Sequence, residues 1–93
     1  MRADVGSYEW YQMLWFAESN WRRSKRGNFY FAGPTGRATN TCTVFHRSDG
    51  WNYLVVLRSE PDFGPGGYET RNQAREAAFD YAMKESGLVP DET

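Results

Sequence analysis

The sequence has little of the chemistry that most catalytic sites require. It contains one His and one Cys, His46 and Cys42. They fall on one predicted strand, roughly 13 Å apart along it, so they cannot form a nucleophile and base pair. One His and one Cys also cannot supply the four ligands of a zinc site. We therefore expect no enzyme activity, no metal and no cofactor, and interpret His46 as a structural residue and Cys42 as a small core residue.

The sequence also lacks a membrane span, a signal peptide and a strong net charge. No run approaches the roughly 20 apolar residues of a spanning helix, and MRADVGSYEW has no apolar core of a signal peptide. The formal net charge is −1, which excludes the whole-domain basic field of non-specific nucleic-acid binders. With a single Cys and no internal disulfide, we expect a soluble cytoplasmic protein.

Aromatic side chains, by contrast, are abundant. The 93 residues form one predicted domain, 1–93, and 17% of them are Phe, Trp or Tyr. A core of this size holds only part of those rings. Several rings are therefore expected on the surface.

Two segments have helical patterns. Ser7 is a candidate N-cap for a helix over 7–21, although a strand is the rival interpretation of this aromatic-rich run. Thr70 and Gln73 fit a capping box that starts a helix over 70–86. The apolar stripe expected on the first helix is Trp10, Met13, Leu14, Ala17 and Trp21, and on the second Ala74, Ala77, Ala78, Tyr81 and Ala82.

Between the helices, residues 28–58 predict a three-stranded antiparallel sheet. Its clearest part is TCTVFHRSDGWNYLVVLR, two alternating runs joined by Asp49-Gly50, a typical hairpin turn. A two-residue loop there pairs Cys42 with Leu57 and His46 with Tyr53. The face expected to be interior carries Cys42, Val44, His46, Tyr53, Val55 and Leu57, and the opposite face carries Phe45, Arg47 and Arg58. The predicted fold is thus α+β, a single layer of two helices on this sheet, in the order α-β-β-β-α.

The Gly- and Pro-rich residues 59–68 predict a loop before the last helix. A Gly-rich loop that leads into a capped helix can hold an anion, here with help from Arg71. A flexible connection is the favoured interpretation, because Glu69 would repel a phosphate and the spacing matches no phosphate-binding motif.

The segment GGYETRNQAREAA, the element order and Gly33-Pro34 resemble the double-stranded RNA-binding domain. Thr70 and Asn72 stand where that family has Ser and a second Lys, and no His follows Gly33-Pro34. The resemblance implies nucleic-acid contacts through Arg71 and Arg75. The positions that match the family's last helix are Arg71, Ala74, Arg75, Ala77 and Ala78.

The elements GNFYF, TVF, GWNYLVV and YETRNQAREAA, in a small acidic chain rich in rings, resemble accessory proteins of phages and mobile elements, anti-CRISPR inhibitors among them. This resemblance implies a stoichiometric inhibitor that blocks a host protein or a protein–nucleic acid complex. Trp, Tyr and Arg are the residues that most often dominate interfaces. The predicted partner-binding residues are Trp15, Phe16, Arg22, Arg23, Lys25, Arg26, Phe45, Arg47 and Arg58.

Two further uses of the first helix stay open at this stage. Its rings either cap one end of the core or form a homodimer interface. The leading hypothesis is a non-enzymatic inhibitor of a host complex, and the alternative is a nucleic-acid binding module of the double-stranded RNA-binding type.

Overall fold

The described chain combines two α-helices with one antiparallel sheet, as in the α+β class. The computed structural model describes residues 6–31, 40–57 and 60–88. The predicted class and its two α-helices are confirmed, but the described sheet has five strands where the sequence predicted three. The elements are α1 (Tyr8–Trp15), the short 3₁₀ helix η1 (Glu18–Asn20), β1 (Arg22–Arg23), β2 (Phe29–Phe31), β3 (Asn40–Arg47), β4 (Gly50–Leu57), β5 (Glu60–Phe63) and α2 (Arg71–Glu85).

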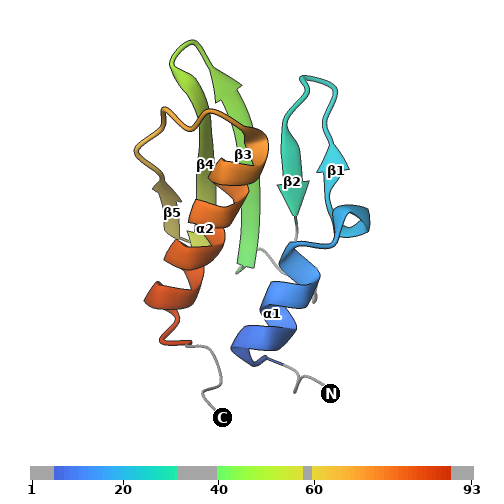
Figure 1. Cartoon of the computed structure of the whole chain (residues 1–93), viewed down its shortest axis with the longest axis vertical. Coiled ribbons are helices and arrows are strands. Elements are labelled where there is room, and N and C mark those ends of the chain that lie inside the picture. The colour runs from blue at the N-terminus through green and yellow to red at the C-terminus, as the bar shows by residue number, and fades with distance from the viewer. Residues whose placement is uncertain (1–5, 32–39, 58–59, 89–93) are drawn as a thin grey trace.

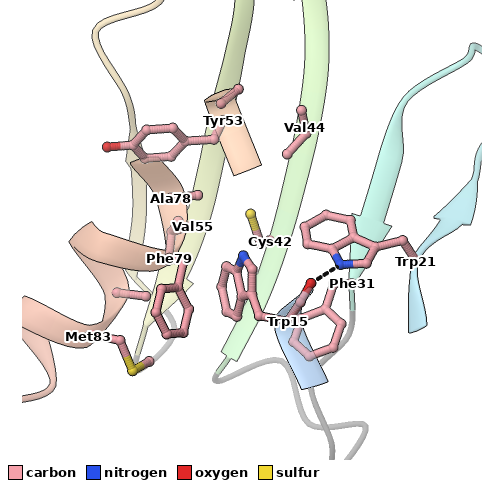
Figure 2. Packing of buried hydrophobic residues seen from close by; sticks show 12 residues of the cluster. Trp15, Trp21, Phe31, Cys42, Val44, Tyr53, Val55, Ala78, Phe79 and Met83 are labelled. Carbon is pink, nitrogen blue, oxygen red and sulfur yellow. Dashed lines mark hydrogen bonds between the residues drawn. The ribbon is translucent and has the colours of Figure 1, made fainter. Parts of the chain in front are cut away.

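The strands form one antiparallel sheet in sequence order, β1-β2-β3-β4-β5; α2 lies across one face of it, and α1 packs beside α2 at the end of the sheet near β2 (Figure 1). The core fills the space between this face and the helices. Figure 2 shows the rings of Trp15, Trp21, Phe31 and Phe79 gathered there. The buried hydrophobic residues are Trp15, Trp21, Phe31, Cys42, Val44, Tyr53, Val55, Ala74, Ala78, Phe79, Ala82 and Met83.

The first helix is shorter than predicted and is rotated relative to the predicted stripe. Ser7 caps it as expected, accepting a hydrogen bond from the Trp10 N–H at 3.2 Å, but the helix ends at Trp15. Met13, expected in the core, is 60% exposed, whereas Trp15 is buried. Trp21 reaches the core only because the chain turns through η1, so its helical spacing from Trp10 was coincidental.

The hairpin of β3 and β4 is confirmed, but its predicted register is wrong. Arg47 pairs with Gly50, so Ser48 and Asp49 form the loop, and Cys42 lies opposite Val55. The reason lies in Gly50, which has a φ of +127° and pairs as the first residue of β4. A Cβ there would lie only 2.7 Å from the Tyr68 carbonyl oxygen. The faces stay as predicted, because the register changes by two and side chains alternate with period two.

Both edge strands were missed. The predicted loop 59–68 contains β5, which pairs Leu54 with Phe63 and Leu57 with Glu60. At the other edge, β1 pairs Arg22 with Tyr30. Pro61 is compatible with a strand here because β5 lies at the edge of the sheet.

The second helix is confirmed together with its signals. The Thr70 hydroxyl accepts from the Gln73 N–H at 3.1 Å, and the Gln73 side chain accepts in return from the Thr70 N–H at 3.2 Å. Gly87, at a φ of +71°, follows the helix as its C′ residue. Ala74, Ala78 and Ala82 are buried as predicted, while Ala77 and Tyr81 are half-buried. In the described part of the chain, neither helix has the length and apolar character needed to cross a membrane.

Candidate binding surface

The face of the sheet opposite the helices is the most distinctive surface of this protein. No helix of the described chain packs on it (Figure 1). The strand registers show which residues it carries. They are Arg22, Tyr30, Thr41, Thr43, Phe45, Arg47, Asn52, Leu54, Val56, Pro61 and Phe63. Among these described strand residues two are arginines and none is acidic, although the whole chain has a net charge of −1.

The centre of this face is a cluster of two rings and one guanidinium. The Phe45 and Phe63 rings meet edge to face, with centroids 6.1 Å apart. The Arg47 guanidinium carbon lies 4.9 Å from the Phe45 centroid and 5.9 Å from the Phe63 centroid. Phe63 stays 60% exposed. Phenylalanine is among the residue types most often buried, so this ring is unusually exposed.

A second exposed ring lies on the same face. Tyr30, 39% exposed, begins a row that continues through Thr43 and Leu54 to Phe63. With strands about 4.8 Å apart, this row spans roughly 14 Å. We call Tyr30, Phe45, Arg47, Leu54 and Phe63 the sheet-face patch. Its combination of rings, an aliphatic side chain and an arginine is typical of protein interfaces.

One end of this face is closed by the Gly-rich connection. Asn52 is buried, and its side-chain N–H donates to the Gly64 carbonyl at 3.1 Å. The Gly64 and Tyr68 N–H groups donate to carbonyls of β4, at 2.9 and 3.1 Å. Beside the Gly-rich connection lies an open hollow of about 460 Å³, and three carboxylate side chains line it. These carboxylates, from Glu69, Glu76 and Asp80, disfavour the binding of an anion in the hollow. The hydrogen bonds attach the Gly-rich connection to the sheet.

The four predicted basic residues of 22–26 do not share one surface. Arg22 lies on the uncovered face beside Tyr30, as its pairing shows. Arg23 lies on the other side, 5.8 Å from the Phe29 centroid. Lys25 and Arg26 are exposed in the turn between β1 and β2. Phe45 and Arg47 lie where predicted, and Arg58 is outside the described residues.

Trp15, which was expected on the surface, is buried, and Phe16 is only half-buried. Trp15 is 2% exposed, and its indole N–H donates to the Arg75 carbonyl at 3.2 Å. Phe16 is half-buried, with its ring 5.2 Å from that of Phe79. The first helix has only two turns, so its rings are needed to close the end of the core.

Arg71 and Arg75, the arginines expected to contact nucleic acid, both lie against the side chain of Glu18. Arg75 is only 7% exposed, and both Arg71 and Arg75 form ion pairs with Glu18, at 3.3 and 3.0 Å. Neither guanidinium projects freely from the outer face of α2, as the RNA-binding alternative requires. Sequence spacing could not reveal Glu18 as their partner, because it lies more than fifty residues away.

His46 and Cys42, the two residues considered for catalysis, differ in burial. His46, expected inside, is exposed, with its ring 5.0 Å from that of Trp51. It lies near the tip of the hairpin, beyond the buried core. Cys42 is buried as expected, and this burial raises the pKa of its thiol. Within the described residues, no three His, Cys, Asp or Glu side chains gather as metal ligands.

These features define a small α+β protein whose sheet is covered on one side and presents an aromatic, arginine-containing patch on the other. Comparisons with protein-family models, with curated proteins and with solved structures find no match to this chain. The functional inference therefore depends on the geometry of this surface.

Proposed function

We propose that this protein is a non-enzymatic binding protein that attaches to another protein through the uncovered face of its sheet. The observation that carries the proposal is Phe63, a phenylalanine 60% exposed beside Phe45 and Arg47. Leaving that ring in water costs free energy that a partner recovers by covering it, at about 25 cal/mol per Å² of apolar surface.

The partner we propose has an apolar centre and acidic groups around it. The rings and Leu54 supply the apolar contact, and Arg22 and Arg47 flank it without a neighbouring carboxylate among the described strand residues of this face. Such charge complementarity governs which partner docks and how fast it does so. Two arginines supply few phosphate contacts, so a nucleic acid fits this face less well.

In biological terms, we propose the mode of action suggested by the resemblance to phage accessory proteins. A chain of 93 residues can inhibit a larger complex by occupying one of its surfaces, with no chemistry of its own. A standard interface needs only about 800 Å² from each partner, which one sheet face can supply. In this proposal the partner binds through the part of the predicted set that includes Phe45 and Arg47, and not through Trp15.

The test is capture from a lysate of the native host with matched variants. Phe63→Ala and Arg47→Glu remove the exposed ring and reverse the charge of the patch. Met13→Ala is the control, because Met13 is also 60% exposed but lies on α1, away from this face. The captured protein is identified, purified and titrated against each variant by calorimetry.

We expect wild type and Met13→Ala to bind this protein equally. Phe63→Ala and Arg47→Glu should each weaken binding by at least about tenfold, the effect of a hot-spot residue, with thermal midpoints within a few degrees of wild type. Binding that survives both substitutions would refute the role of the patch. Capture that disappears after nuclease treatment would identify a nucleic-acid partner and refute the proposal of a protein partner.

A further inference from the structure

A second charged site lies on the helix side of the sheet, where two guanidinium groups converge on one carboxylate. Arg71 and Arg75 occupy successive turns of α2, and Glu18 belongs to η1. The Nη2 atom of Arg71 lies 3.3 Å from Oε1 and 3.4 Å from Oε2 of Glu18. Nη1 of Arg75 lies 3.0 Å from the same Oε1. Two arginines thus bind a single carboxylate group.

Both guanidinium groups are held in place by contacts that do not involve Glu18. The Arg75 side chain is 9% exposed, donates from Nη2 to Asn72 Oδ1 at 3.0 Å and lies 5.8 Å from the Trp21 ring. The Arg71 guanidinium carbon lies 4.1 Å from the centroid of the Phe29 ring. Removal of the Glu18 carboxylate would therefore leave both cations in position.

The hydrogen-bonding groups and charges of the two arginines are not all matched by Glu18. Nε of Arg75 is buried and has no hydrogen-bond partner within the described structure. Two positive charges face a single negative charge, so the site retains one unit of excess positive charge. Trp21, Phe29 and Val44 pack closely beside the two arginines and leave no room for a water molecule on that side, which strengthens charge interactions there.

Glu18 is also the outermost member of the group. Its side chain is 59% exposed, compared with 29% for Arg71 and 9% for Arg75. Rotation of this one side chain into water would uncover the two guanidinium groups without opening the core. Because Glu18 is largely in water, solvent weakens its side of both ion pairs, so another anion can exchange with it.

We propose that Arg71 and Arg75 form a binding site for a phosphate-type dianion, which Glu18 occupies in the free protein. Two guanidinium groups match a dianion in charge, and their paired N–H groups match its oxygens. The site lies on the opposite side of the sheet from the sheet-face patch. It can therefore bind its anion whether or not the patch binds a protein.

The experiment compares three variants with inorganic phosphate as the probe. Glu18→Ala removes the internal carboxylate. Glu76→Ala is the control, since it removes an exposed carboxylate of α2 that has no ion pair with either arginine. The double variant Glu18→Ala/Arg71→Gln removes one guanidinium as well. Each protein is titrated with sodium phosphate at pH 7.5, with sodium chloride of equal ionic strength as the reference.

Binding is measured by the phosphate-dependent shift of the thermal midpoint and by NMR of the arginine Nε–H signals well below that midpoint. A ligand that binds only the folded state raises the midpoint with concentration. We expect phosphate to bind Glu18→Ala at least about tenfold more tightly than wild type or Glu76→Ala, and to shift the Arg75 Nε–H signal. The double variant should lose this binding.

Two results would overturn the proposal. If phosphate affects Glu18→Ala no more than chloride does, the Glu18 contact is a structural ion pair only. If the double variant binds phosphate as well as Glu18→Ala, the anion is held elsewhere. The NMR titration decides both cases even where a substitution lowers the thermal midpoint, because it compares each variant with and without phosphate in its folded state.

Discussion

Trp15 is the largest of the fully buried side chains, and it links several elements through one ring. Its ring centroid lies 6.0 Å from that of Trp21, 5.1 Å from that of Phe31 and 5.8 Å from that of Phe79. Its own carbonyl accepts a hydrogen bond from the Trp21 indole N–H. One residue therefore joins α1 to Trp21 after η1, to β2 and to α2 (Figure 2).

Trp15→Ala is predicted to lower the free energy of unfolding by about 3–5 kcal/mol, the usual cost of truncating a large buried ring. The substitution also leaves the Arg75 carbonyl without its indole donor. Urea denaturation monitored by far-UV circular dichroism measures the change. Met13→Ala, at an exposed position of the same helix, should stay within about 0.5 kcal/mol of wild type. A similar small change for Trp15→Ala would show that its ring is not part of a packed core.

At this scale the sequence could identify the apolar residues but not which of them are buried. A helical period defines a face only over several turns, and α1 has eight residues. Trp10, Met13 and Leu14 fit one stripe as well as Tyr8, Tyr11 and Trp15 fit another. What decides between them is the position of Phe79 on α2, which contacts Tyr8, Trp15 and Phe16. That long-range contact has no local signal.

Among the elements, β5 and α2 are joined by a hydrogen bond between two side chains. The Tyr81 hydroxyl donates to Asp62 Oδ2 at 2.8 Å. Because the carboxylate accepts the phenolic proton, this bond raises the pKa of Tyr81 to about 12. The bond holds the last strand of the sheet against the second helix.

The stability contributed by this bond is predicted to depend on pH. A tyrosine in the unfolded chain has a pKa of about 10, so the folded state binds this proton more tightly. The contribution is complete below pH 10 and is lost as the pH rises through 12. We expect wild type to exceed Tyr81→Phe in stability at pH 8 and the difference to shrink between pH 10 and 12. Urea denaturation of both proteins across this range measures it, and a constant difference would contradict the assignment.

The elements with local signals were predictable, and those formed by pairing alone were not. The capping box of α2 and the alternation of β3 and β4 are encoded within a few residues. By contrast, β1 has two residues, and β5 has the sequence EPDF, which contains no β-branched residue. These segments become strands because the neighbouring strands offer them unpaired backbone groups. A segment that gains its structure from a neighbour cannot be identified from its own sequence.

For the whole molecule, the candidate surface was predictable only where one hairpin carries it. Alternation assigned Phe45 and Arg47 to the face away from the helices, and the registers confirm this. Tyr30 and Phe63 belong to β2 and β5, whose alignment with the hairpin depends on pairing across the sheet. The sequence therefore predicted only the part of the patch on the hairpin, and the pairing of β2 and β5 with the hairpin adds Tyr30 and Phe63.

The whole molecule is also predicted to unfold in one step, with Cys42 as the reporter. The buried hydrophobic residues form a single cluster contributed by α1, β2, β3, β4 and α2 together with Trp21, so no described element has a separate core. Cys42 is 1% exposed within it, and burial raises the pKa of its thiol, so the native thiol should not react with Ellman's reagent. Across a urea titration, we expect thiol reactivity, tryptophan fluorescence and circular dichroism to change with the same midpoint. Labelling of Cys42 at urea concentrations that leave the tryptophan signal native would contradict this. It would mean that β3 detaches from the helices while Trp15 and Trp21 remain packed, and that the two ends of the core are separate units.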